Sequence, residues 1–261
     1  MDPNFVRVLT MCGWALLAAV GVFIARHFIS NETLHENHEF TGFTYAILGA
    51  IYGVYLAFTV VVVWEQFAQA DDDAVSEAVH LSEAWRDTTV LPKEARRVLH
   101  EHMKAYADAV IEREWPSMAA GHGADAEAAA KYEEVWQAMY AAKADARTPG
   151  DNAFFQEAVA QMNDVGMERR MRLMSSTSQL PPVMWMLLIG GGAITILFTY
   201  MIGTENVWIR ILATASMAAL IVFTLLLIAA LQHPFGGDVS VKPDGFEGVT
   251  KSFVNRLQTE R

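Results

Sequence analysis

The chain has 261 residues, 53% of them hydrophobic, and it carries a formal net charge of −11. A positive mean hydropathy in an acidic chain means that apolar spans alternate with acidic, solvated segments. The acidic balance argues against a nucleic-acid partner, because no basic stripe is available to neutralise phosphates. The single cysteine, Cys12, lies in the first apolar stretch, so no disulfide can form within one chain.

Four apolar stretches are long enough to cross a hydrocarbon core about 30 Å thick, at about 5–27, 43–65, 183–203 and 207–232. The first stretch has no convincing cleavage site, so we interpret it as an uncleaved transmembrane helix rather than a signal peptide. Short connections within each pair predict two antiparallel hairpins. The sequence therefore predicts an all-α membrane protein with four transmembrane helices as two hairpins and a helical cytoplasmic region between spans two and three.

The predicted domains follow from these spans. They are a first transmembrane hairpin (1–67), a cytoplasmic helical region (68–180), a second transmembrane hairpin (181–233) and a cytoplasmic tail (234–261). Twelve of the nineteen Lys and Arg residues lie in 68–180, four follow Pro234, and the two hairpin loops have none. Because positive charge favours the cytoplasmic side, we expect a multi-pass membrane protein with both termini in the cytoplasm.

The polar middle segment has helical periodicity throughout. We expect Ala70–Val90 to continue the second span, a helix from Lys93 to Trp115 that ends at Pro116, and two further helices over Asp125–Arg147 and Asn152–Ser178. No alternating strand pattern occurs in the sequence.

The second span carries a polar stripe. At about 100° per residue, Tyr45, Tyr52, Thr59 and Gln66 share one helix face. Thr59 can bond back to its own helix, or the stripe can face a hydrated lumen formed by several copies of this helix. In the second interpretation these side chains line a pore at the axis of an oligomer.

A second face of the same span is smooth. Gly49, Gly53 and Ala57 recur every four residues, a spacing that lets two membrane helices approach closely. The partner is either the first span of the same chain or a helix of a neighbouring subunit.

Three acidic residues, Asp71, Asp72 and Asp73, follow where this helix would leave the membrane. They are either a solvated acidic face or, in a ring of subunits, a cytoplasmic mouth that attracts cations. A calcium site is a further alternative, but the spaced oxygen ligands of an EF-hand loop are missing.

Catalytic motifs are absent from the sequence. There is no P-loop, no Gly-x-Ser-x-Gly and no His-Glu-x-x-His, and Cys12 has no candidate base nearby. The histidine and glutamate residues of the first loop have mixed spacing, which is a weak pattern for a transition metal. We therefore predict a protein that is not an enzyme and holds no cofactor and no metal.

Several short stretches resemble one known family. They are Gly49 to Phe58, Trp64-Glu65, Ser76 to Leu81, Tyr106 through Glu114-Trp115-Pro116, Arg170-x-Arg172-Leu, His233-Pro-Phe-Gly-Gly and Val239-Ser-Val-Lys-Pro. In this order, over about 42–250, they resemble the bestrophin-like domain family of bacterial membrane proteins. The plan is also similar to that of bestrophins, which are pentameric ion channels whose second membrane helix lines the pore. Tyr52, Tyr55 and Phe58 are nearest to the bestrophin aromatic neck, which adds Tyr55 to the pore-lining candidates. An acidic cluster like the bestrophin calcium clasp is missing after the fourth span.

The function that these features predict is an oligomeric, pentameric ion channel of the inner membrane that favours cations. Its expected partners are the lipid bilayer, further copies of the same chain and small ions. One alternative is a stator-like, energy-transducing subunit that works with a partner protein. Another is a membrane sensor or scaffold that does not conduct ions.

Overall fold

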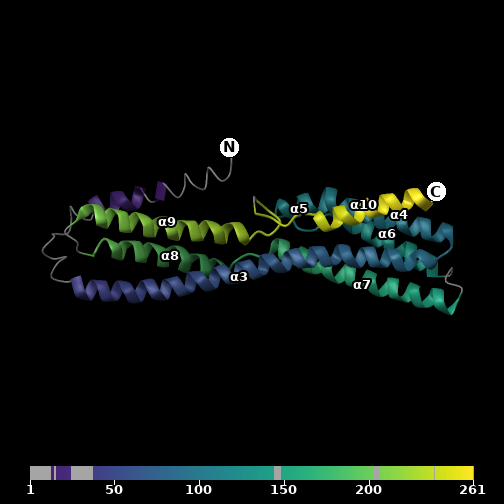
Figure 1. Ribbon diagram of the computed structural model, residues 1–261, viewed down its shortest axis with the longest axis horizontal. Coiled ribbons are helices and arrows are strands. Elements are labelled where there is room, and N and C mark those ends of the chain that lie inside the picture. The colour runs from purple at the N-terminus through teal and green to yellow at the C-terminus, as the bar shows by residue number, and fades with distance from the viewer. Residues whose placement is uncertain are drawn as a thin grey trace. The chain divides into compact units, whose positions relative to one another are not determined.

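The structure is a computed structural model that describes residues 13–14, 16–24, 38–143, 148–202, 206–237 and 239–260. Every regular element in these ranges is helical, and no strand occurs among them (Figure 1). The contacts between residues divide the chain into two compact units. Unit 1 comprises Met1–Trp64 and Gln179–Gln232, and unit 2 comprises Glu65–Ser178 and His233–Arg261.

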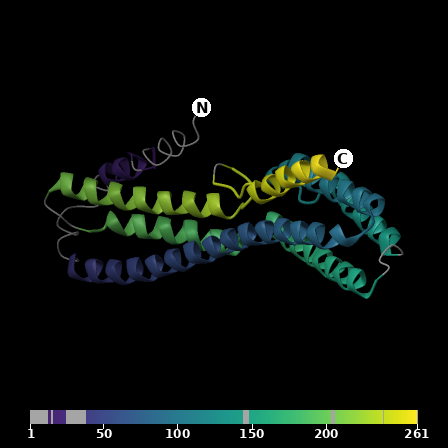
Figure 2. The same cartoon turned by 45° about the vertical axis from the view of Figure 1, so that its right-hand side comes forward.

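Unit 1 contains the apolar helices. They are the first part of α3 (His38–Asp87), α8 (Pro182–Thr199) and α9 (Val207–Leu231), and Figures 1 and 2 show α8 and α9 side by side. In the described part of the chain, three helices are long and apolar enough to cross a membrane, within Phe40–Val90, Pro182–Thr199 and Val207–Leu231. These correspond to the second, third and fourth predicted spans.

The first predicted span lies partly outside the described residues. Residues 16–24 of it are helical, and Ala18 accepts a hydrogen bond at 3.1 Å from the hydroxyl of Tyr200, at the end of α8. Asn206 caps the start of α9 by accepting from the backbone N–H groups of Trp208 and Ile209, which satisfies two donors that the first helical turn leaves free.

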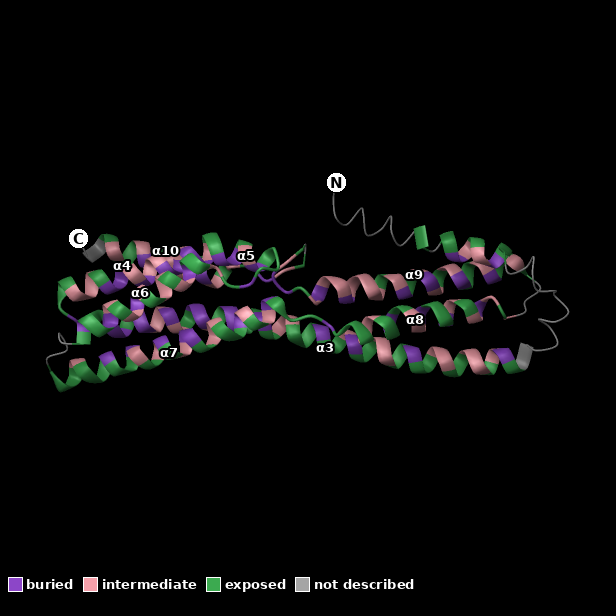
Figure 3. Cartoon of the chain, turned by 180° about the vertical axis from the view of Figure 1, so that it is seen from behind, coloured by how far each residue is buried: buried purple, intermediate pink, exposed green. Residues whose placement is uncertain are grey.

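Unit 2 is a helical bundle around one apolar core. It is built from the second part of α3, the short helix η1 (Thr88–Val90), α4 (Lys93–Ala109), η2 (Val110–Glu114), α5 (Trp115–Ala119), α6 (Ala126–Ala142), α7 (Pro149–Thr177) and α10 (Asp244–Glu260). Trp85 is fully buried between the rings of His100 and Phe253, each stacked at a centroid distance of 3.8 Å. This stack joins α3, α4 and α10. Figure 3 shows the buried residues of the chain in purple.

The predicted helix from Lys93 to Trp115 differs in two ways from the observed one. Residues 110–114 form a π-helical turn, η2, and Pro116 does not end the helix. Pro116 lies in the first turn of α5, where a missing N–H costs little, so the chain stays helical to Ala119. The turn that follows contains Gly121 at a φ of 77°, a left-handed conformation that glycine adopts without strain.

The next two helices have clear start signals. The Asp125 side chain accepts from the backbone of Glu127 and Ala128 and caps α6. Thr148 and Asp151 form a capping box, so α7 begins at Pro149, three residues before the predicted start. Residues 144–147 of the predicted third helix lie outside the described residues.

Helix α10 was not among the predicted elements. Phe246 and Phe253, two turns apart on one face, are both fully buried in the unit 2 core. The tail after Pro234 is therefore part of the unit 2 bundle.

Candidate functional site

The membrane part of α3 presents three unlike faces, and the first of them packs on α8. Tyr52 is 7% exposed, and its hydroxyl donates to the carbonyl of Leu188 at 2.8 Å. Its ring covers Gly191 and Gly192, where a Cβ on Gly191 would lie only 2.7 Å from a ring carbon. The two glycines of α8 thus make room for this tyrosine.

The remaining polar side chains of the stripe follow the same face. Thr59 is buried and donates to the carbonyl of Tyr55 at 2.9 Å, so the bond back to its own helix is the alternative found. Tyr55 in turn donates to the carbonyl of Met184 on α8 at 3.1 Å. Tyr45 is half-buried and Gln66 is exposed. The structure therefore turns Tyr52, Tyr55 and Thr59 toward partners inside one chain.

The second face is the row of small residues. Gly49, Gly53 and Ala57 line an apolar groove of about 540 Å³, and residues of α9 such as Leu220 and Ile221 form its far wall. A Cβ built on Gly49 or Gly53 would meet no described atom within 4 Å. The small face is therefore not packed against any described residue of its own chain.

The third face points away from α8 and is apolar. At about 100° per residue, Val54, Phe58 and Val61 lie roughly opposite Tyr52. They are 56%, 68% and 50% exposed, and Glu65 continues the row at the start of unit 2. No described side chain covers this face.

The three aspartates that follow the span differ in their exposure to solvent. Asp71 and Asp72 are exposed, whereas Asp73 is 3% exposed and faces the interior of unit 2. Only two of the three predicted mouth residues thus present their charge to water in the single chain.

A buried ion network lies deeper in unit 2. Arg172 of α7 donates to Glu77 of α3 at 2.6 and 3.2 Å and to Glu114 of η2 at 2.7 Å, and all three side chains are 0% exposed. Arg169 donates to the other oxygen of Glu114, and the Tyr106 hydroxyl donates to Glu77. Two carboxylates are therefore matched by two guanidinium groups, which is the condition for burying charge.

Local structure explains how these groups meet. The π-helical turn adds a residue to the helix and places Glu114 inside the bundle. Trp115 and Phe246 lie beside the Arg172 guanidinium, with ring centroids at 5.4 and 5.9 Å. Although burial works against its charged form, Glu77 holds the pKa of Arg172 above its ordinary value. Burial and Glu77 likewise raise the pKa of Tyr106, so its hydroxyl remains a donor.

Sequence reasoning did not assign a role to this network. Glu77, Glu114 and Arg172 entered only as members of the stretches that carry the family resemblance. The signal that could have revealed them is a charged residue on an otherwise apolar helix face, as with Glu77 among Ala74, Ala78 and Leu81.

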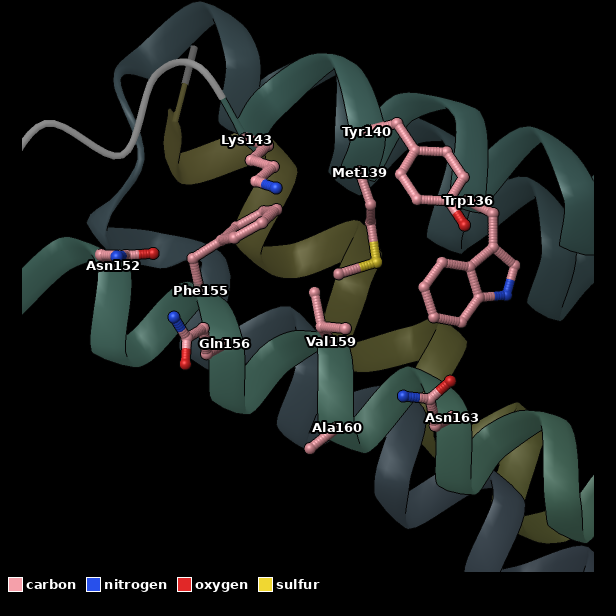
Figure 4. Close-up of a pocket in the computed structure, with 10 residues that line it drawn as sticks. All are labelled: Trp136, Met139, Tyr140, Lys143, Asn152, Phe155, Gln156, Val159, Ala160 and Asn163. Atoms are coloured by element: carbon pink, nitrogen blue, oxygen red, sulfur yellow. The ribbon is translucent and has the colours of Figure 1, made fainter.

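A separate groove of about 440 Å³ lies between α6 and α7 (Figure 4). Trp136 and Tyr140 of α6, with Lys143 just after its end, line one side of the groove, and Gln156 and other residues of α7 line the other. No residue of this groove was predicted as a site. Throughout the described ranges, no three His, Cys, Asp or Glu side chains are grouped so that they could hold a metal ion.

Together these features define an all-helical membrane protein with an uncovered apolar helix face and a charge-matched, buried ion network. Residues 12–246 match the Bestrophin-like domain, so the chain belongs to the bestrophin-like family. The family resemblance expected from the sequence is thereby confirmed.

Solved structures with a similar fold include crystal structures of substituted forms of a bacterial bestrophin homolog from Klebsiella pneumoniae. One is 11% identical with a TM-score of 0.70, covering 96% of this chain and 98% of that one. Another is 10% identical with a TM-score of 0.69, covering 97% and 98%. A crystal structure described as a membrane protein is 9% identical with a TM-score of 0.70, covering 97% and 98%. Comparison with curated proteins gives no match.

Proposed function

We propose that the chain forms a homopentameric ion channel of the bacterial inner membrane, with its pore lined by the membrane part of α3. The observation that carries this proposal is family membership over residues 12–246, because bestrophins are pentameric ion channels. The proposed topology places unit 2 and both termini in the cytoplasm, in line with the distribution of Lys and Arg.

The burial pattern of α3 supports a particular lumen face. Its polar side chains Tyr52, Tyr55 and Thr59 are bonded within the chain, so the side of the helix away from α8 is free to meet the axis of a ring. We assign Val54, Phe58 and Val61 to the narrow part of the pore. An apolar constriction of this kind gates by excluding water. Tyr45 and Gln66 stay candidates for contact with the pathway at the two ends of the span.

The small-residue face supports an interface between copies. Gly49, Gly53 and Ala57 are open toward a groove that no described residue fills. In the pentamer, a membrane helix of the adjacent copy occupies this groove, because small residues allow close helix contact.

The charges after the span support a preference for cations. Glu65, Asp71 and Asp72 are exposed on α3, and five copies arranged around one axis would concentrate negative potential where the helix enters the cytoplasm.

Cysteine substitution tests the lumen face. On a Cys12→Ala background, Phe58→Cys and Val54→Cys channels in planar bilayers lose current when a water-soluble methanethiosulfonate reagent is added. Leu212→Cys is the matched control, because Leu212 of α9 is 69% exposed, like Phe58, but faces lipid in the proposal.

Two results would contradict the assignment. Block of Tyr52→Cys and Thr59→Cys channels, with Phe58→Cys and Val54→Cys unaffected, would return the lumen to the polar stripe. Equal block of Leu212→Cys would show that exposure alone, rather than a position at the axis, decides reactivity.

A further inference from the structure

A carboxyl group is buried without a countercharge between α3 and α7. Asp73 is 3% exposed, one of its oxygens (Oδ1) accepts from the Gln69 side chain at 2.7 Å, and Oδ2 has no hydrogen-bond partner among the described residues. An ionised carboxylate in such a place is unfavourable, because burial disfavours charge that is neither paired nor fully hydrogen-bonded.

Helix α7 carries a second acidic side chain, Glu168, whose pKa responds to Asp73. Burial raises the pKa of the half-buried Glu168, and the Asp73 carboxylate raises it further, with smaller contributions from Glu77 and Asp164. Burial raises the pKa of Asp73 as well. The hydrogen bond from Gln69 lowers this pKa, and the Asp72 carboxylate raises it. The buried Asp73 carboxylate therefore disfavours the ionised form of Glu168 on the facing helix.

Two arginines of α7 are paired with other carboxylates, so they do not neutralise Asp73 or Glu168 in the seam between α3 and α7. Arg172 is held by Glu77 and Glu114, and Arg169 is held by Glu114. His80 of α3, whose Nδ1 lies 2.7 Å from the Gln161 side-chain oxygen, is the titratable base that acts on Glu168 and lowers its pKa.

Helix α10 also packs against this part of α3. Helix α10 approaches α3 at Gly245, where an added Cβ would lie 3.4 Å from the Cβ of Ala78. The acidic residues of its first turn, Asp244 and Glu247, are exposed.

We propose that Asp73 and Glu168 form a proton-binding site in the seam between α3 and α7. A proton bound by either carboxyl removes the repulsion between them, and a proton on Asp73 also removes an unpaired buried charge. The seam then holds α3 and α7 together more tightly in mild acid than at neutral pH. This proposal does not depend on ion conduction.

The sign of the effect follows from proton linkage. The ordinary pKa values are 3.8 for Asp73 and 4.5 for Glu168, and both are raised in the folded protein. The folded state therefore binds protons more tightly than the unfolded state, and the seam destabilises the fold when both groups are ionised. This destabilisation is present at neutral pH and is relieved as the pH falls through the raised values toward the ordinary ones.

Thermal unfolding of the full chain in detergent, from about pH 8 to about pH 5, tests the proposal. Asp73→Asn, which keeps the size of the side chain, raises Tm at the upper end by about 3–5 °C for each pH unit by which the pKa of Asp73 is raised. The gain shrinks as the pH falls. Asp71→Asn, two residues away at an exposed position of α3, is the control and shows no such trend.

Three outcomes would overturn the proposal. One is a Tm that falls in Asp73→Asn at every pH, and another is a difference from wild type that does not change with pH. The third is a rise in wild-type Tm on adding Ca²⁺ or Mg²⁺ at pH 8 that Asp73→Asn abolishes, which would make the seam a metal site. If Asp73→Asn does not fold, Glu168→Gln, at a half-buried position, supplies the same comparison.

Discussion

Replacing Arg172 by methionine tests the buried ion network, because it removes the guanidinium and keeps most of the apolar stem. Glu77 and Glu114 then remain fully buried with Arg169 as the one remaining guanidinium of the network. Removing one partner of a buried ion pair costs about 3–5 kcal/mol. At about 2–4 °C per kcal/mol for a chain of roughly this size, we expect Tm to fall by about 6–20 °C.

The assay is thermal unfolding of the full chain in detergent, followed by far-ultraviolet circular dichroism. Arg170→Leu is the control, because Arg170 lies on the same helix but is exposed, and a surface change of this kind alters stability by about 0.5 kcal/mol at most. When Glu77→Gln and Glu114→Gln are added to the Arg172→Met chain, the uncompensated buried charge is removed. We expect much of the fall in Tm to be recovered. An Arg172→Met chain that melts together with the Arg170→Leu control would refute the reasoning.

Three further predictions use the same assay. Gly191→Ala lowers Tm, because the new Cβ would meet the Tyr52 ring, whereas Gly190→Ala, whose Cβ meets nothing within 4 Å, does not; equal shifts would contradict the packing. Thr148→Ala removes the capping box of α7 and costs about 1 kcal/mol, and an unchanged Tm would exclude that role. Burial lowers the pKa of His100 to about 4 from 6.5, so the folded state resists protonation and loses stability as the pH falls between these values. His100→Gln flattens that loss, and an unaltered slope would assign it to other groups.

Local signals in the sequence were sufficient for much of the helix pattern. Pro92 at the start of α4, Asp125 before α6 and the apolar periodicity of α4 act within a few residues, so they can be recognised without knowing the fold. The π-helical turn at Val110–Glu114 could not be predicted in this way. It brings Glu114 to Arg169 and Arg172, which lie more than 50 residues away in sequence, so no local pattern marks it.

Helix α10 was missed although its signal was present. Phe246, Val249, Phe253 and Leu257 recur at three and four residues, the spacing of an amphipathic helix. The preceding run of Pro234, Gly236 and Gly237 is typical of a loop, so the short segment after it also resembles an unstructured tail.

Helical periodicity alone could not predict what the polar stripe of α3 contacts. Sequence spacing places Tyr52 and Thr59 on one face of α3, which the structure agrees with, but it cannot say what that face meets. The neighbours are Leu188, Gly191 and Gly192, more than 130 residues away, where two glycines admit the Tyr52 ring. A hydroxyl in an apolar span needs a partner, and a carbonyl of another helix serves as well as water does.

The central claim is that this chain conducts ions through a pore lined by α3, and recording from purified protein in planar bilayers tests it most directly. The account predicts discrete, cation-selective currents, with an altered unit conductance in Phe58→Ala and an unaltered one in Leu212→Ala. No current above that of empty bilayers, across voltage and pH, would contradict it.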